Sequence, residues 1–195
     1  MNHTKSDNEL MHEFAGCSMD SFTAVFNRYK NRILNFVLRG YLHDKDNAED
    51  IVQKTFIRVY EYKYKYNTTN QFSTWVYTIA KNLSLNELKR KRKLITDDDP
   101  DDTEKFLAED ESLSQKIEKQ NIQELLTKAI ELLKPKYREV IVMRYLQGMS
   151  YEEISGITSK RINTLKSQSK RGLKQIRDKI RNYGIEEEEQ ISTGN

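Results

Sequence analysis

A segment near the C-terminus, residues 161–182, repeats amide, hydroxyl and cationic side chains at helical spacing. Its apolar residues are expected to face a core, and they are Ile162, Leu165, Leu173, Ile176 and Ile180. A rotation of about 100° per residue then places five side chains on the opposite face, namely Asn163, Ser167, Lys170, Arg171 and Lys174. Such groups bind base edges and phosphates in the major groove of DNA. The pattern favours DNA binding, and the alternative is an amphipathic helix whose outer face is only solvated.

Aromatic and cationic residues alternate earlier in the chain, in the run EYKYKY at residues 61–66. Five consecutive cations follow at residues 89–93. Aromatic rings stack on unpaired bases and cations follow the phosphate backbone, a combination typical of single-strand binding. The alternative is that some of the tyrosines at positions 60, 62, 64 and 66 cover a helical bundle.

The stretch HDKDNAED, residues 43–50, is the best candidate for a metal site and therefore for a hydrolytic enzyme. It fails the pattern of a calcium loop, because Ala48 stands where a ligand is needed and Glu49 where the glycine is needed. The three histidines are scattered and no nucleophile motif accompanies them. The sequence therefore predicts no catalytic residue, no metal, no cofactor and no enzyme activity.

The net charge of +3 hides three blocks of alternating sign. Residues 81–93 contain six Lys or Arg against one Glu, residues 97–111 contain nine Asp or Glu against one Lys, and residues 121–184 contain fourteen Lys or Arg against six acids. The acidic block also contains Pro100 and few apolar residues, so it is not expected to pack a core. It is predicted to be a flexible linker between two folded parts.

Both folded parts are predicted to be helical, since the chain has only 2 Pro and 7 Gly and its apolar residues recur at three-and-four spacing. In the first part, three helices share apolar faces, and Asp46 with Glu49 is expected to cap the second. In the second part, Gly148 is placed to end a helix, and Ser150 with Glu153 forms a capping box. The prediction is an all-α protein with these segments: a loose N-terminus 1–20, a bundle 21–95, an acidic linker 96–120, a helix-turn-helix domain 121–183 and a tail 184–195.

The expected cellular compartment follows from the absence of disulfide, signal-peptide and membrane-span patterns in the sequence. Cys17 is the only cysteine, so no disulfide framework exists within the chain. The first residues lack the apolar stretch of a signal peptide, and no apolar run has the length of a membrane span. We expect a cytoplasmic protein without membrane insertion.

Four stretches, in this order and spacing, carry a family resemblance: AEDIVQKTFIRVYEY, FSTWVYTIAKNLSLNELKRKRK, LKPKYREVIVMRYLQGMSYEEISGI and INTLKSQSKRGLKQIR. Together they resemble the two domains of a bacterial RNA polymerase sigma factor of the extracytoplasmic-function (ECF) type, within the sigma-70 superfamily. The resemblance covers roughly residues 22–93 and 121–181. It implies a region 2 bundle and a region 4 helix-turn-helix, and a function in promoter-specific transcription initiation.

The resemblance implies contacts with core RNA polymerase. The helix at residues 46–60 would dock on the clamp helices of the largest subunit, and the helix that begins at Ile122 would help bind the flap. The implied polymerase contacts are Asp46, Glu49, Asp50, Gln53 and Phe56. It also implies an anti-sigma factor as a partner, which would mask the polymerase-binding surface.

The resemblance implies two contacts with promoter DNA. The first domain would capture and melt the minus-ten strand through Asn70, Ser73, Trp75, Asn82, Lys89, Arg90 and Arg92. The second domain would read the minus-thirty-five element through Arg144, Arg161, Asn163, Thr164, Lys166, Ser167, Gln168, Lys170, Arg171 and Lys174. The acidic linker would occupy the cationic channels of the polymerase as a mimic of nucleic acid, unless it is only a solvated spacer.

The chain departs from the family pattern at three positions in the helix-turn-helix. Ser159 and Asn163 stand where many relatives carry glycine, and Gln168 stands where arginine is frequent. Serine in the turn would cost little if its backbone φ angle were negative. The main alternative function is a stand-alone helix-turn-helix regulator, which would bind duplex DNA without polymerase.

Overall fold

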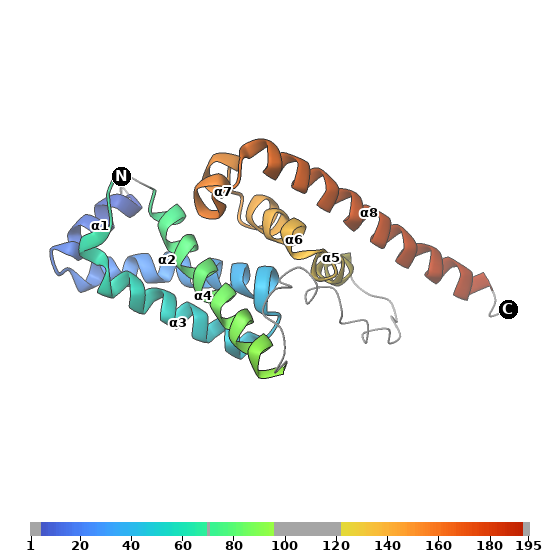
Figure 1. The fold of residues 1–195 in the computed structure, drawn as a ribbon, viewed down its shortest axis with the longest axis horizontal. Helices are drawn as coiled ribbons and strands as arrows, with labels where there is room; N and C mark the ends of the chain where they lie inside the picture. The colour runs from blue at the N-terminus through green and yellow to red at the C-terminus, as the bar shows by residue number, and fades with distance from the viewer. Residues whose placement is uncertain (1–4, 70, 96–121, 193–195) are drawn as a thin grey trace.

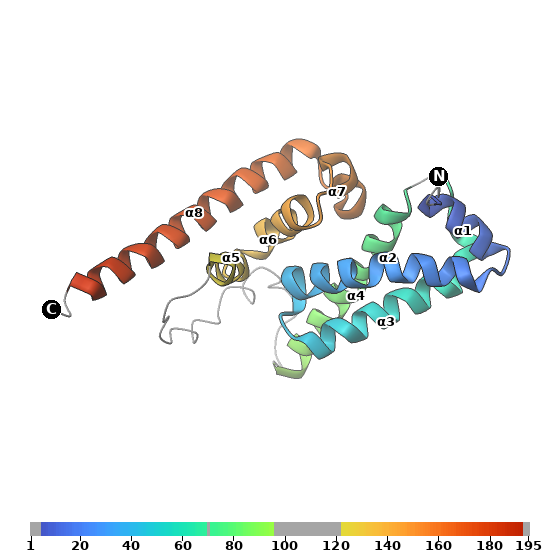
Figure 2. The same ribbon diagram turned by 180° about the vertical axis from the view of Figure 1, so that it is seen from behind.

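The computed structural model describes residues 5–69, 71–95 and 122–192, and these residues form helices and no strand. The helices fall into two groups that lie side by side (Figures 1 and 2). The first group precedes residue 96 and the second follows residue 121. The predicted acidic linker, residues 96–120, lies outside the described residues, and so does Asn70.

The first helical unit is a bundle built on three long helices, α2, α3 and α4. Its elements are α1 (Asp7–Ala15), α2 (Met19–Val37), the π-helical turn η1 (Leu38–Leu42), α3 (Lys45–Glu61), the 3-10 turn η2 (Lys63–Lys65) and α4 (Phe72–Ile95). Apolar side chains from all four α-helices form the core, among them Phe14, Ile33, Ile51 and Val76. The three helices expected from the sequence are therefore present, with α1 in addition.

Helix α1 occupies part of the segment expected to be a loose N-terminus. Ser6 and Glu9 form a reciprocal capping box at its start, which satisfies backbone N–H groups that a helix end otherwise leaves unpaired. Leu10, Met11 and Phe14 are buried against the bundle. These residues follow helical spacing, so the signal for α1 is present in the sequence.

The N-terminus of α3 differs from the expectation. Asp44, rather than Asp46, is the N-cap, and its side chain accepts a hydrogen bond of 2.8 Å from the backbone N–H of Asn47. The preceding residue, His43, has a φ of 50°, so the chain turns sharply there before extending into the cap. The helix therefore begins at Lys45, and Asp46 lies in its first turn. A carboxylate at this position interacts favourably with the helix dipole.

The second helical unit contains α5 (Ile122–Glu131), α6 (Pro135–Ile141), the π-helical turn η3 (Val142–Leu146), α7 (Tyr151–Thr158) and α8 (Ile162–Ser192). The capping box of Ser150 and Glu153 is confirmed at the start of α7. Gly148, just beyond η3, has a φ of 72° as expected for a helix-ending glycine. Helix α8 continues past residue 183 and extends away from the rest of the molecule (Figure 1).

The turn between α7 and α8 contains an unfavourable backbone conformation. Ser159 has a φ of 57°, in the left-handed region, so the condition under which serine would cost little in this turn is not met. The inner face of α8 also differs in one position. Leu173 is exposed, and the buried residues around it are Ser169 and Gly172, because only a small residue fits where α8 meets α6.

The two units touch along α2, η1 and α4 of the first and α5, α6, η3 and α7 of the second. Tyr77 of α4 lies at this boundary, fully buried, and its hydroxyl donates to Gln147 Oε1 at 2.7 Å. In the described parts of the chain, no helix is both long enough and apolar enough to cross a bilayer.

Replacing Ser159 by glycine is expected to stabilise the protein, because glycine adopts positive φ angles without steric cost. We expect Ser159→Gly to raise the free energy of unfolding by about 0.5–1 kcal/mol. Equilibrium urea unfolding measures the change. Ser167→Gly, at an exposed site within α8, is the matched control and is expected to lower the same quantity by about 0.5 kcal/mol. A loss of stability in Ser159→Gly would contradict the left-handed turn.

Candidate nucleic-acid interface

Helix α8 is held in place by the turn before it and by α6 beneath it. Ser155 Oγ donates to the carbonyl of Lys160 at 2.8 Å, which ties α7 to the start of α8. At Gly172 the two helices approach so closely that a Cβ atom would lie 2.9 Å from Ile141 Cγ1. A larger residue there would push the helices apart, so the orientation of α8 depends on this contact.

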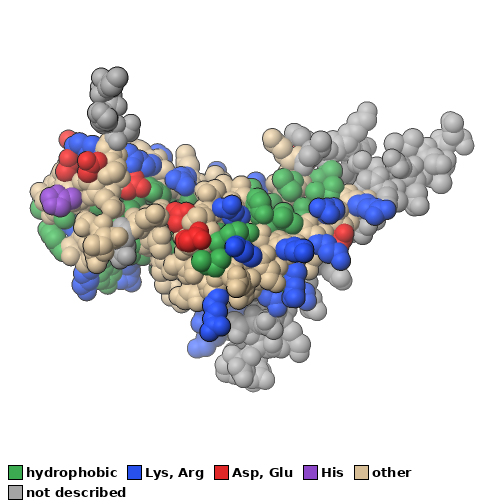
Figure 3. Space-filling view, turned by 90° about the horizontal axis from the view of Figure 1, so that it is seen from above, with side chains coloured by type: hydrophobic (Ala, Val, Ile, Leu, Met, Phe, Trp, Pro, Cys, Tyr) green, Lys and Arg blue, Asp and Glu red, His purple; other side chains and the backbone are tan. Residues whose placement is uncertain are grey.

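The side chains expected on the outside of α8 are there. Asn163, Ser167, Lys170, Arg171 and Lys174 are all exposed, and together they are called the recognition face. Three other predicted contact residues are exposed beside it, Arg161, Thr164 and Lys166. Figure 3 shows Lys and Arg side chains gathered over the half of this surface that α8 crosses. The orientation is thus confirmed, whereas contact with DNA stays a prediction.

A hollow of about 390 Å³ lies between the recognition face and α6. Its lining residues are Lys136, Tyr137, Asn163, Thr164, Ser167, Gln168 and Arg171. Gln168 is half-buried, and its Oε1 atom is buried without a hydrogen-bond partner in the part of the chain that the structure describes. A buried amide oxygen without a hydrogen-bond partner lowers the stability of the fold, unless a ligand donates a hydrogen bond to it. Lys136, which the sequence analysis did not single out, adds a cation from the α6 side.

Arg144, a predicted phosphate contact, has a structural role in this unit. Its Nη1 donates to the carbonyl of Met149 at 2.7 Å, and its guanidinium lies 5.0 Å from the centre of the Tyr151 ring. It therefore braces the connection between η3 and α7. Because of these contacts, fewer of the guanidinium N–H groups of Arg144 are available to bind a phosphate.

The predicted cations at the end of α4 are not equivalent. Arg90 donates to Glu87 through both Nη2, at 2.6 Å, and Nε, at 3.0 Å. This pairing lowers the pKa of Glu87 and offsets one positive charge of the basic run. Lys89 and the amide of Asn82 are exposed, and Arg92 is half-buried.

The aromatic residues around the start of α4 form a small, partly buried cluster. The Tyr66 ring centre lies 5.0 Å from that of Trp75 and 5.8 Å from that of Phe72. Tyr60 and Tyr64 are exposed, and Lys63 lies 5.1 Å from the centre of each ring. Tyr62 and Tyr66 are half-buried and Tyr60 packs against Phe14 and Phe22, so some of the tyrosines do cover the bundle. Tyr64 has the ring most accessible to a base.

Helix α1 holds the segment that joins this aromatic cluster to α4. Asn8 Nδ2 donates to the carbonyl of Thr68 at 2.9 Å, and the Tyr66 hydroxyl donates to Asn8 Oδ1 at 2.6 Å. Burial, and then the nearby carboxylate of Asp7, raises the pKa of Tyr66 to about 12, so its hydroxyl keeps its proton. Sequence reasoning missed Asn8 because its partners lie about 60 residues away.

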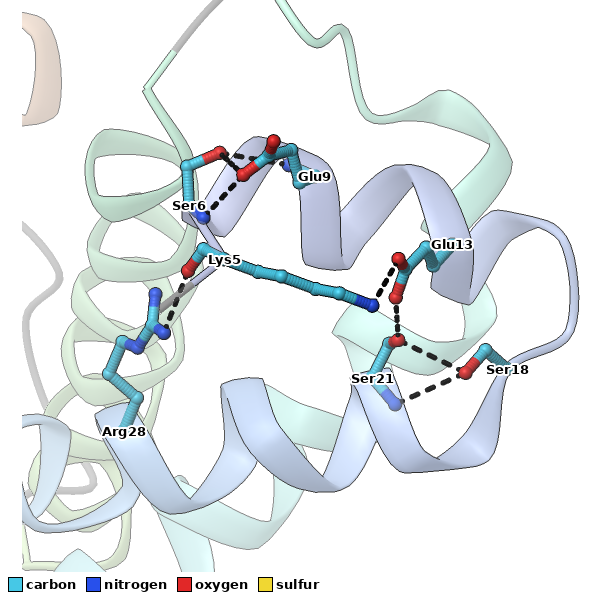
Figure 4. Close-up of polar contacts among 7 residues, drawn as sticks. All are labelled: Lys5, Ser6, Glu9, Glu13, Ser18, Ser21 and Arg28. Atoms are coloured by element: carbon cyan, nitrogen blue, oxygen red, sulfur yellow. Dashed lines mark hydrogen bonds and ion pairs between the residues drawn. The ribbon is translucent and has the colours of Figure 1, made fainter. Parts of the chain in front are cut away.

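Polar contacts hold α1 against α2 (Figure 4). Glu13 accepts hydrogen bonds of 2.5 Å from both Lys5 and Ser21, and these bonds lower its pKa. Arg28 donates to the carbonyl of Lys5 at 3.0 Å. Arg28 and Tyr29 also both donate to the carboxylate of Asp7, one residue before Asn8. These contacts determine where Asn8 lies.

The outer side of α3 presents most of the predicted polymerase contacts. Asp46, Glu49 and Gln53 are exposed, and Asp50 is partly exposed and paired with Lys54 at 2.5 Å. Phe56 differs, since it is only 3% exposed and its ring packs 4.8 Å from that of Phe26. Its neighbour Ile57 is 55% exposed, so it is the apolar residue that a partner can reach.

The HDKDNAED segment serves the fold instead of a metal. Asp44 caps α3, as described above, and His43 Nε2 contacts the guanidinium of Arg138. Burial, then Arg138 and Arg39, lowers the pKa of His43 to about 4. Within the described residues, no group of three or more His, Cys, Asp or Glu side chains is arranged to hold a metal ion.

Models of known protein families match both helical units. The model for Sigma-70 region 2 matches residues 25–94, and the model for Sigma-70, region 4 matches residues 123–176. The chain is 31% identical to the ECF RNA polymerase sigma factor SigW of Bacillus subtilis, over 83% of this chain and 90% of the relative. It is 30% identical to the ECF RNA polymerase sigma factor SigE of Mycolicibacterium smegmatis, over 87% of this chain and 65% of the relative.

Solved structures show the same fold. The sigma factor RpoE of Bartonella quintana, in complex with the anti-sigma factor NepR, has a TM-score of 0.67 and 19% identity, covering 82% of this chain and 96% of that one. CnrH, in complex with the cytosolic domain of CnrY, has a TM-score of 0.64 and 17% identity, covering 89% of this chain and 96% of that one. The protein belongs to the ECF RNA polymerase sigma factors of the sigma-70 family. It acts in transcription initiation and is not an enzyme.

Removing the Asn8 side chain is expected to loosen the segment before α4. Asn8→Ala deletes the bonds to Thr68 and Tyr66, so we expect faster amide hydrogen exchange at residues 66–69. The emission of Trp75, the only tryptophan, is expected to shift because Tyr66 packs against it. Asn27→Ala, at an exposed site on α2, is the control and should change neither signal. Unchanged exchange in Asn8→Ala would contradict the positioning role.

Proposed function

We propose that this sigma factor binds core RNA polymerase and directs it to promoters. In this proposal the first unit melts the minus-ten element and the second reads the minus-thirty-five element. The observation that carries it is the pairing, in one chain of this family, of an exposed aromatic and cationic cluster with an exposed recognition face. The first surface suits unpaired bases and the second suits a duplex groove.

Polymerase binding is assigned to the outer side of α3. Asp46, Asp50, Gln53 and Ile57 recur at spacings of three and four, so they form one stripe along the helix. The stripe combines carboxylates, which steer association with a basic partner, and an exposed apolar residue that gains from burial. Phe56 supports this stripe from inside the bundle. The clamp helices of the largest polymerase subunit are the proposed partner.

Capture of the minus-ten strand is assigned to the start of α4 and the segment before it. Tyr66 and Trp75 give stacking surfaces, and Ser73 and Asn82 offer hydrogen bonds to bases or phosphates. Lys89 and its neighbours at the basic end of the helix would hold the phosphate backbone. Asn8 is a positioning residue in this scheme, because it holds the backbone at Thr68.

Readout of the minus-thirty-five element is assigned to the recognition face. Asn163 and Gln168 can form paired hydrogen bonds with a base, and Lys170 and Lys174 can pair with phosphates. Gln168 lines the hollow, and its Oε1 atom is buried and unpaired, so the amide would have to turn outwards to take part in readout. The flap of the second large polymerase subunit is the proposed partner of α5.

Two further features complete the proposal. The Bartonella relative was solved with an anti-sigma factor, and we infer a partner of this class here. The acidic linker is proposed to lie in the cationic channels of the polymerase. A stand-alone regulator remains the alternative function, and it differs by binding its DNA site tightly without polymerase.

Run-off transcription with purified core polymerase and genomic fragments tests the proposal. The wild-type protein is expected to direct discrete transcripts. Ile57→Glu is expected to weaken core binding by at least about tenfold, or about 1.4 kcal/mol, because it places a charge in the apolar part of the stripe. Met19→Glu, at another exposed apolar site, is the control. Tight promoter binding by the free chain, without transcription on adding core polymerase, would favour the stand-alone regulator.

Two substitutions on the recognition face are expected to act differently. Lys170→Gln should weaken binding to all sequences and reduce the slope of log K against log salt by about 1, because one phosphate contact is lost. Asn163→Ala should instead lower discrimination at one base position, by about 1–3 kcal/mol. Titrations of holoenzyme with promoter variants at several salt concentrations measure both. Lys45→Gln, on the other unit, is the control, and an equal loss in it would contradict the assignment.

A further inference from the structure

Two ion pairs lie within the first unit where α3 and α4 pack side by side (Figures 1 and 2). On α3, the Lys54 ammonium lies 2.5 Å from the Asp50 carboxylate. On α4, Arg90 donates to both carboxylate oxygens of Glu87, from Nη2 at 2.6 Å and from Nε at 3.0 Å. The α3 pair belongs to the side assigned to polymerase, and the α4 pair belongs to the basic end assigned to DNA.

The two pairs are close enough to act on each other. The hydrogen bonds from Arg90 lower the pKa of Glu87, and the positive charges of Lys91 and Lys54 lower it further. In the same way, Glu87 raises the pKa of Arg90, and the negative charge of Asp50 adds to this effect. Lys54 is therefore attracted to Glu87, and Arg90 is attracted to Asp50. Asp50, Lys54, Glu87 and Arg90 are together called the charge network.

Glu87 restrains the guanidinium of Arg90. The N–H groups that Arg90 donates to this carboxylate are the ones that would bind a phosphate, since both anions take the same paired geometry. Glu87 is only 8% exposed, and a buried carboxylate without a cation beside it is strongly unfavourable. Arg90 can therefore leave for a phosphate at low cost only if another cation takes its place at Glu87.

Lys54 can supply that replacement, and Asp50 controls whether it does. The Lys54 side chain is about half exposed, and its ammonium is a compact charge on a flexible stem. A basic group of the polymerase that pairs with Asp50 would displace Lys54, which can then turn to Glu87. The same pairing would cancel the attraction of Asp50 for Arg90. Both changes act in one direction, because each of them weakens the hold on Arg90.

We propose that the charge network couples the two surfaces of the first unit, so that a cation bound at Asp50 releases Arg90 from Glu87 to bind a phosphate of the promoter strand. This rests on the proposed function, since it assumes that α3 binds polymerase and that the end of α4 binds DNA. Lys54 and Glu87 are positioning residues in this scheme, because they act on DNA through Arg90.

Neutralising Asp50 in the free full-length chain imitates the first step. In Asp50→Asn we expect the Nε–H of Arg90 to exchange with water about threefold faster, because the pair with Glu87 is weakened. Nitrogen-15 NMR measures this exchange, and the Arg90 signal is assigned by its absence in Arg90→Lys. Glu49→Gln removes an exposed carboxylate of the same helix, which is paired with Lys45, and as the matched control it should leave the exchange unchanged. Unchanged exchange in Asp50→Asn would overturn the proposal.

The salt dependence of promoter binding tests the DNA side, with holoenzyme formed in excess core polymerase. Lys54→Gln should reduce the slope of log K against log salt by about 1, because Glu87 then keeps Arg90 from its phosphate. Adding Glu87→Gln to Lys54→Gln should restore the slope, since no carboxylate then holds Arg90 back. Adding Glu61→Gln instead is the matched control, because it removes the carboxylate of another ion pair in this unit, with Arg58, and should restore nothing.

Each outcome of the salt experiment decides a separate point. An unchanged slope in Lys54→Gln would overturn the proposal. A reduced slope that Glu87→Gln does not restore would overturn it too, since Lys54 would then contact DNA itself. In both cases promoter binding by the wild-type holoenzyme would leave the proposed function intact. Absence of that binding would instead count against the proposed function, and Arg90 exchange in the free chain would still decide whether Asp50 controls Arg90.

Discussion

Helix α4 is packed from two sides, and the proposed minus-ten surface depends on its position. Val76 and Ala80 lie in the core of the first unit, where the Tyr77 ring also packs 5.0 Å from that of Phe36. The Tyr77 hydroxyl reaches in the opposite direction, to Gln147 of the second unit. One buried side chain thus connects both units. The start of the same helix presents Ser73 and Trp75, and its end presents the basic run.

The basic and acidic parts of the chain lie on different surfaces of the folded protein. The cations of α4 and α8 are attractive to DNA, and the exposed carboxylates of α3 are suited to a basic protein surface. A third acidic group, Glu153, lies near Ser73 at the start of α4. Attraction between groups of opposite charge, such as Arg39 and Glu131, helps to hold the two units together.

Much of the fold follows from local patterns in the sequence. The capping box at Ser150 and the apolar stripes of α2, α3 and α4 predict the helices, and 100° rotation predicts the recognition face. Two errors have local causes. Asp44 caps α3 because the chain turns at His43, and Leu173 is exposed because Gly172 takes the contact with α6.

The remaining features depend on partners distant in sequence, which periodicity cannot reveal. Asn8 meets Thr68, Tyr41 meets Glu139, and Phe56 is buried because Phe22 and Phe26 of α2 surround it. The family resemblance predicts which helices bind polymerase and DNA, but it does not predict that α7 covers α4. That contact is visible only once the two units are placed together.

The most direct test of the account is whether the chain, together with core polymerase, melts the minus-ten region of a promoter. Chemical probing of unpaired thymines reports the melting, with the wild-type chain and with Trp75→Ala compared. We expect thymines near minus ten to become reactive with the wild-type holoenzyme, and to react less with Trp75→Ala although core binding is retained. Absence of reactive thymines with the wild-type holoenzyme would contradict the account.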